Sequence, residues 1–239
     1  MVTPEIALVA FFAGLLPALL WLVFWLLEDA KRPEPKWLVL VAFITGMVAV
    51  VAVLPLQGAT LGVISMGPGL IIVWALIEEV MKFALGWIIV LRHRAVDEPL
   101  DFLLYLVTIA LGFAALENTL FLLSPLAEGR FMESIVMGNL RFIGATLIHV
   151  LSSAIIGAAL AFAFYREMRH KILYGAVGVI LATALHALFN FLIISTGQAQ
   201  LLTVFLGVWV GIIFLLLMFE RVKLVRRPAW WEKVFTKSV

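Results

Sequence analysis

Long apolar runs separated by short polar breaks dominate the chain, and their length indicates the class of protein. An apolar helix needs about 20 residues to cross the hydrocarbon of a bilayer. We predict seven such helices, at 5–27, 37–56, 68–91, 102–123, 138–165, 172–194 and 200–220. The Gly-rich stretch 58–69, which overlaps the start of the third run, is compatible with a loop, a half-helix or a re-entrant segment. The predicted fold is therefore an all-α, polytopic transmembrane helix bundle.

Composition supports this interpretation. Hydrophobic residues make up 64% of the 239 residues and charged residues only 13%, and the mean hydropathy is +1.15. No hydrophilic block is long enough for a separate soluble domain, so we expect one integral membrane domain over 1–239 with its polar motifs at 68–194. The start lacks a basic region typical of a secretory signal, which predicts that the first run is retained. We expect a prokaryotic plasma membrane. The absence of cysteine excludes disulfides and thiolate ligands.

Lysine and arginine predict the orientation of the spans, because cytoplasmic loops carry an excess of both. Basic residues gather in the first, third and fifth loops and the tail, while the other loops contain only Arg130. This alternation places the N-terminus outside and the C-terminus in the cytoplasm. We interpret 226–231 as an interfacial anchor on anionic lipid. Since topology accounts for the basic residues, the pI of about 9.0 does not indicate a nucleic-acid partner.

Ionisable residues nevertheless lie within four of the predicted spans, where each costs several kcal/mol and marks a functional site by default. Counting 1.5 Å per residue from the cytoplasmic boundaries puts Glu79, Glu117, His149 and His186 about 20 to 25 Å deep. They should therefore meet at one level in the outer half of the bilayer. The candidate catalytic residues at or near this level are Glu78, Glu79, Glu117, His149, His186 and Asn190.

Some of these residues and their neighbours could have structural rather than catalytic roles. Glu78 and Glu79 could form an ion pair with Lys82 that only fixes helix packing, and Asn118 and Asn190 could serve as interhelical hydrogen bonders. Arg141 lies about 37 Å from the boundary by the same count, so we expect it at the outer interface. Because low dielectric disfavours two adjacent ionised carboxylates, we expect either a cation beside the glutamates or protonation of one of them.

The chemistry that this set of side chains supports is open at this point. Two histidines and up to three carboxylates suit a divalent metal such as zinc. They equally suit acid–base work without a metal, in which a carboxylate activates water while a histidine or asparagine stabilises an oxyanion. Proton- or ion-coupled transport would use the same groups as a relay.

Four motifs in order resemble those of a known family. They are Glu78-Glu79-x-x-Lys82, Gly112-Phe113-Ala114-Ala115-Leu116-Glu117-Asn118, Arg141 with Thr146 and His149, and His186-x-x-x-Asn190. Together they resemble the PrsW family of intramembrane proteases, which is related to the type II CAAX prenyl endopeptidases. Those endopeptidases usually have Phe-x-x-x-His where this chain has Phe113-x-x-x-Glu117, which favours the PrsW branch.

The resemblance implies hydrolysis of a peptide bond in a single-pass, membrane-anchored protein, such as an anti-sigma factor. It implies that Glu78 activates water and that Glu79 assists or coordinates. His149, His186 and Glu117 would hold zinc or another divalent metal; in a metal-free enzyme, His186 and Asn190 would stabilise the oxyanion. A transporter, or a non-catalytic scaffold of the same superfamily, is the alternative.

Overall fold

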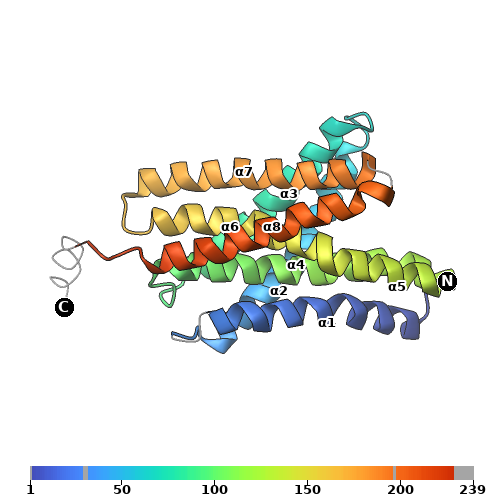
Figure 1. The fold of residues 1–239 in the computed structure, drawn as a ribbon, viewed down its shortest axis with the longest axis horizontal. Coiled ribbons are helices and arrows are strands. Elements are labelled where there is room, and N and C mark those ends of the chain that lie inside the picture. Colours follow the sequence, from blue (N-terminus) through green and yellow to red (C-terminus); the bar gives the residue numbers. More distant parts are fainter. Residues whose placement is uncertain (1, 29–31, 196–197, 229–239) are drawn as a thin grey trace.

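The structure is a computed structural model that describes residues 2–28, 32–195 and 198–228. The described residues form seven continuous helices, two of which contain a π-helical turn, and no strand (Figure 1). In chain order the segments are α1 (Pro4–Glu28), α2 (Lys36–Thr60), α3 (Pro68–Gly86) with η1 (Trp87–Leu91), α4 (Pro99–Ala127), α5 (Phe131–Leu140), η2 (Arg141–Ala145), α6 (Thr146–Phe162), α7 (Met168–Ser195) and α8 (Gln198–Lys223).

The predicted all-α membrane fold is confirmed, and every predicted run is a helix. Six helices of the described chain are long and apolar enough to cross a membrane. The helix α3 is not among them, because its 19 residues include Glu78, Glu79 and Lys82. Among the connections, the Gly-rich stretch is a short turn, since α2 continues to Thr60 and α3 begins at Pro68.

One predicted boundary is wrong by about two turns. The fifth helix begins at Phe131 rather than at 138 and continues through η2 into α6, ending at Phe162. Charged residues near its start suggested a longer loop in the sequence. In the structure Arg130 pairs with Glu133 across the first turn, so these charges belong to the helix start.

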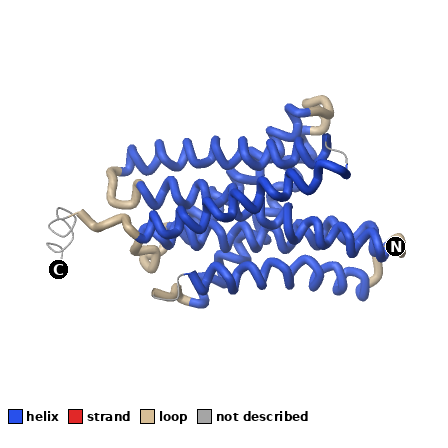
Figure 2. The backbone as a smooth tube through the Cα atoms, in the orientation of Figure 1, coloured by secondary structure: helices blue, strands red, loops and turns tan. Residues whose placement is uncertain are grey.

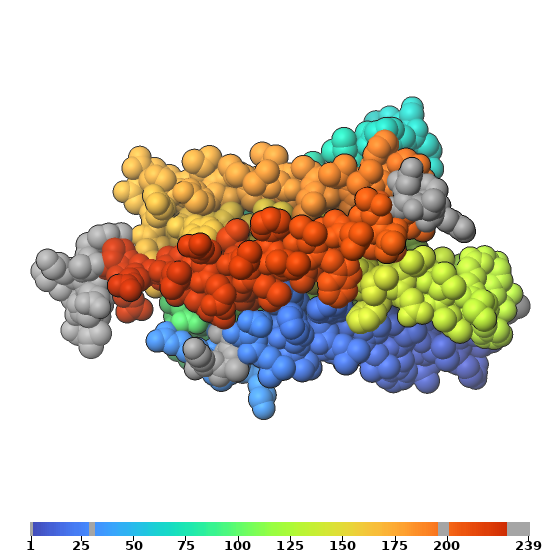
Figure 3. Space-filling model, viewed as in Figure 1, coloured from blue at the N-terminus to red at the C-terminus, as the bar shows by residue number. Residues whose placement is uncertain are grey.

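The helix α4 is the centre of the bundle and is almost entirely buried. It packs against α1, α2 and α6, while α7 packs against α3 and α6. The helix α8 crosses the face shown in Figure 3 and contacts α6. The contact between α2 and α4 requires glycine: a Cβ at Gly112 would lie 1.9 Å from the carbonyl oxygen of Phe43, and one at Gly46 equally close to that of Ile109. Polar side chains on α3, α6 and α7 are thereby held around a fixed α4.

The connecting loops gather at the two ends of the bundle (Figure 2). The described chain starts at one end and α8 finishes at the other (Figure 1). At the end of the bundle where α8 finishes, a hollow of about 800 Å³ is lined by residues that include Arg32, Glu98 and Lys223. Which end faces the cytoplasm stays a prediction. Within the predicted interfacial anchor, Ala229, Trp230 and Trp231 lie outside the described residues.

Candidate active site

Four helices deliver acidic, basic and imidazole side chains to one cluster inside the bundle. Glu78, Glu79 and Lys82 come from α3, and all three are buried. His149 of α6 and His186 of α7 are each only 2% exposed, and their ring centroids lie 4.8 Å apart. Glu117 of α4 contacts this group through His149. Side chains separated by more than 100 positions in the sequence thus share one site, as the depth count predicts.

Glu79 is held by three donors. Its Oε1 accepts from Lys82 Nζ at 2.6 Å and lies 2.7 Å from His186 Nδ1, and Ser153 Oγ lies 3.5 Å from its Oε2. Because an ion-paired carboxylate only accepts, Nδ1 of His186 carries the proton of this hydrogen bond. The Nε2 of a neutral His186 is then left with a lone pair. Glu79 therefore neutralises Lys82 and orients His186.

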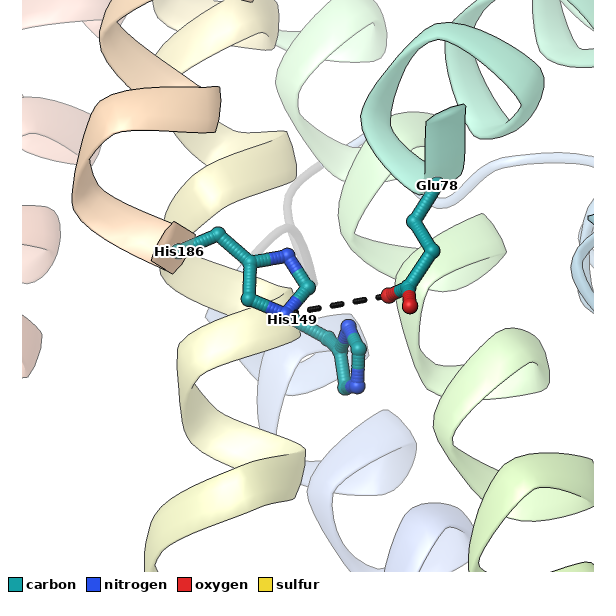
Figure 4. A group of neighbouring side chains, drawn as sticks. All are labelled: Glu78, His149 and His186. Carbon is teal, nitrogen blue, oxygen red and sulfur yellow. Dashed lines mark ion pairs between the residues drawn. The ribbon is translucent and has the colours of Figure 1, made fainter. Parts of the chain in front are cut away.

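Glu78 is held much more loosely, although it lies one turn from Lys82 on the same helix. Gln57 donates to its Oε1 at 2.9 Å. Its Oε2 is buried and has no hydrogen-bond partner in the described part of the chain, and the nearest histidine atom is His186 Nε2 at 3.7 Å (Figure 4). A buried carboxylate oxygen without a partner carries a desolvation cost, so it suits a water or a cation that is not part of the chain.

A second ion pair surrounds Glu117. Its Oε2 contacts Arg141 Nη2 and lies 3.0 Å from His149 Nε2. Arg141 also donates through Nε to Asn118 at 2.6 Å, and Asn118 in turn donates to Thr146 at 3.0 Å. Asn118 thus serves as the interhelical hydrogen bonder between α4 and α6 that the sequence allowed.

The depth of Arg141 relative to a membrane stays a prediction, but its side chain has partners inside the bundle. Its guanidinium turns onto Glu117 and lies 3.9 Å from the centre of the Phe121 ring. The depth count locates the backbone of Arg141 and takes no account of its long side chain, which reaches Glu117. Burying Glu117 beside His149 also requires a compensating charge, and Arg141 is the cation that provides it.

One group of side chains has the spacing of a metal site. Single ligand atoms of Glu78, His149 and His186 all lie within 4.8 Å of one another. This set differs from the ligands suggested by the sequence, since Glu78 replaces Glu117. Two imidazoles and a carboxylate are a familiar zinc set, and the partnerless Glu78 Oε2 suits a cation. Each histidine also contacts a carboxylate through its other nitrogen, as metal-bound histidines usually do.

Two polar residues change the site that the sequence suggested. Gln57, which holds Glu78, was missed because it lies beside a Gly-rich stretch that resembles a loop; its only signal is an amide near the end of an apolar run. Asn190, one turn after His186, is half-buried and has no side-chain hydrogen bond to another described residue. Its role stays a prediction.

Comparison with known proteins decides the family. The family described as "PrsW family intramembrane metalloprotease" matches residues 34–218, which is most of the chain and includes every residue of this site. The chain belongs to the PrsW family. It is accordingly an intramembrane metalloprotease, a hydrolase with several apolar helices, and the resemblance inferred from the four motifs is confirmed.

Individual PrsW relatives cover most of the chain at low identity. Protease PrsW of Shouchella clausii is 27% identical over 189 residues, which is 78% of this chain and 84% of the relative. Protease PrsW of Bacillus subtilis is 27% identical over 190 residues, covering 78% and 83%. Protease PrsW of Geobacillus kaustophilus is 26% identical over 224 residues, covering 92% of each chain. No solved structure matches this PrsW chain.

An apolar hollow of about 490 Å³ between α3 and α7 lies close to the site. Its lining includes Leu76, two residues before Glu78, and Ala187, directly after His186. Thr183 also lines it, and its hydroxyl has no hydrogen-bond partner in the described chain. A PrsW protease acts within the bilayer, so an apolar hollow beside the polar cluster is consistent with that activity.

Proposed function

We propose that this PrsW protease hydrolyses a peptide bond of a membrane-anchored protein with water that Glu78 deprotonates. The observation that supports this role is the difference between the three glutamates. Glu79 is ion-paired with Lys82 and Glu117 with Arg141, whereas Oε2 of Glu78 is buried without a partner in the described chain. A proton acceptor needs a lone pair that no other group holds, and Oε2 of Glu78 has one in the described chain.

The other residues orient and complete this centre. Glu78, His149 and His186 are the proposed metal ligands, and a divalent metal held by them would polarise the substrate carbonyl and the attacking water. The Glu78 oxygen that is not bound to the metal would accept the proton of that water. His186 is held through Nδ1 by Glu79, so the lone pair on its Nε2 is oriented towards Glu78 and is available to the metal. The protonated Glu78 returns its proton to the departing amine. Arg141 and Glu117 fix the ring of His149.

The proposed substrate is a single-pass protein of the anti-sigma-factor type, cleaved in the outer half of a bacterial plasma membrane. The class of substrate follows from the PrsW resemblance. The depth of the cleavage site in the membrane follows from the residue count along the predicted spans. The apolar hollow between α3 and α7 supports entry of an apolar segment from the side, because Thr183, which lines it, lies about one turn before His186.

Cleavage of a membrane-anchored candidate co-reconstituted in vesicles tests the proposal. Glu78→Gln and His186→Ala should each lower the cleavage rate at least about 100-fold, the lower limit of the usual contribution of acid–base catalysis. The matched control is Glu133→Gln, since Glu133 is an exposed glutamate at the start of α5. Normal processing by both site variants would contradict the assignment. A wild-type protein that leaves every candidate substrate intact but moves ions would favour the transporter alternative.

A further inference from the structure

Lys82 lies in the middle of the site, although no step proposed above uses it. Its Nζ is 2.6 Å from Glu79 Oε1 and 3.3 Å from His149 Nδ1. The side chain is fully buried, and Nζ also lies 5.0 Å from the centre of the Phe113 ring. The site therefore contains a cation of its own, bonded to one of the proposed metal ligands.

The contact with Lys82 determines which nitrogen of His149 carries the proton. An ammonium group has only donors, so His149 Nδ1 must accept and the ring proton must be on Nε2. That proton faces Glu117 Oε2 at 3.0 Å. His186 has the opposite arrangement, with Nδ1 donating to Glu79. The free lone pair of His186 therefore faces Glu78, while that of His149 is held by Lys82.

A metal ion that binds His149 must displace one of these contacts. Binding through Nδ1 takes the lone pair to which Lys82 donates. Binding through Nε2 removes the hydrogen bond to Glu117 and moves the proton to Nδ1, where it would face the ammonium. In both cases a divalent ion also comes within a few ångströms of a buried positive charge, which repels it strongly at low dielectric.

We propose that Lys82 is a positioning residue that competes with the metal ion for His149. This inference rests on the proposed ligands Glu78, His149 and His186. Glu78 and His186 would hold such an ion, and His149 would join them only where the ammonium gives up its contact with Nδ1. Lys82 thus joins Glu79 to His149 and should make metal binding weaker than the same three ligands would give without it.

Titration of Zn²⁺ alone into metal-stripped full-length protein in nanodiscs tests the competition. Lys82→Met removes the charge at similar length and should bind Zn²⁺ about tenfold more tightly or better. Lys82→Arg keeps the charge and should bind no more tightly than the wild type. In a His149→Ala background Lys82→Met should give a smaller gain, because the contested ligand is gone. Equal or weaker binding by Lys82→Met overturns the proposal, and so does an absence of Zn²⁺ binding in every variant.

A measurement on the wild type keeps the test independent of how well the variants fold. ¹⁵N NMR of histidine-labelled, metal-free protein should show His149 protonated at Nε2 and His186 at Nδ1. A His149 protonated at Nδ1 overturns the inference. The protease assignment is judged separately by the cleavage rates of Glu78→Gln and His186→Ala, so the failure of one proposal is distinguishable from that of the other.

Discussion

At the scale of single residues, two adjacent glutamates have different environments because they lie on different sides of one helix. Successive positions on a helix diverge by about 100°, so Glu78 and Glu79 cannot share a partner equally. Lys82 lies within reach of both and contacts Glu79. Glu79 is thereby part of the packing, and Glu78 is available for chemistry.

Replacing each of the two glutamates by glutamine should change the free energy of unfolding by different amounts. Glu79→Gln leaves the buried Lys82 without its counter-charge and should lower the free energy of unfolding by about 3–5 kcal/mol. Glu78→Gln removes no ion pair to Lys82 and should change it by less than about 1 kcal/mol. Denaturant unfolding of both variants in detergent measures the difference. Equal losses of stability would show that the two glutamates are not divided in this way.

The sequence predicted which residues share the site because the depth of a residue in a span can be counted along its helix. Glu79, Glu117, His149 and His186 are separated by whole spans, yet a count from each membrane boundary brings them together. The count locates backbone positions and could not foresee that the Arg141 side chain reaches Glu117. It could not assign partners either: the pairing of Lys82 with Glu79 rather than Glu78 depends on side-chain packing that spacing alone does not determine.

At the scale of helices, the length of each apolar run predicted every helix, whereas polar residues near the helix ends made the boundaries less predictable. The start of α5 was missed because Arg130 and Glu133 resemble a loop when their ion pair is unknown. Small residues allow α4 and α6 to pack closely, as Gly157 shows: a Cβ there would lie 2.7 Å from Leu103 Cα. Glycine spacing indicates that a close contact exists, but the partner helix emerges only from the fold.

Glycine at the crossing of α2 and α4 gives a prediction for stability. A side chain at Gly112 would meet the backbone oxygen of Phe43, which cannot move away as the end of a flexible side chain can. Gly112→Val should therefore lower the free energy of unfolding by at least about 1–3 kcal/mol, the usual cost of overpacking. Gly58→Ala is the matched control, because no atom lies within 4 Å of a Cβ at that position of α2. A Gly112→Val protein as stable as this control would contradict the close crossing.

At the scale of the whole molecule, the polar site and the charged end of the bundle are separate regions joined by α4. Glu117 lies in its second half and Asp101 in its first turn, where Asp101 accepts from the backbone amides of Asp97 and Glu98. Glu34, in the connection before α2, accepts a hydrogen bond from Tyr105 of α4. The loops at this end are therefore fastened to the same helix that carries one glutamate of the site.

Glu34 should make the stability of this end depend on pH. Partial burial raises the pKa of the Glu34 carboxyl above its usual value of 4.5, although hydrogen bonds with Tyr105 and Asp101 oppose the rise. The carboxylates of Glu98 and Asp97 add to it. As the pH increases from 4.5 through the raised pKa, the unfolded chain loses this proton before the folded protein does. The contribution of Glu34 to stability is therefore complete below pH 4.5 and is lost as the pH rises through the raised pKa.

Glu34→Gln separates this effect from other titrations of the protein. The amide keeps an oxygen that can accept from Tyr105 but carries no proton to lose, so the variant should unfold at a higher denaturant concentration than the wild type at neutral pH. Unfolding midpoints measured across pH 4 to 8 should therefore diverge between the two proteins as the pH increases. Glu167→Gln is the control, because Glu167 lies exposed in the connection between α6 and α7. Parallel curves for wild type and Glu34→Gln would mean that the folded protein does not retain this proton, and Glu34 would then accept the hydrogen bond from Tyr105 as an ionised carboxylate.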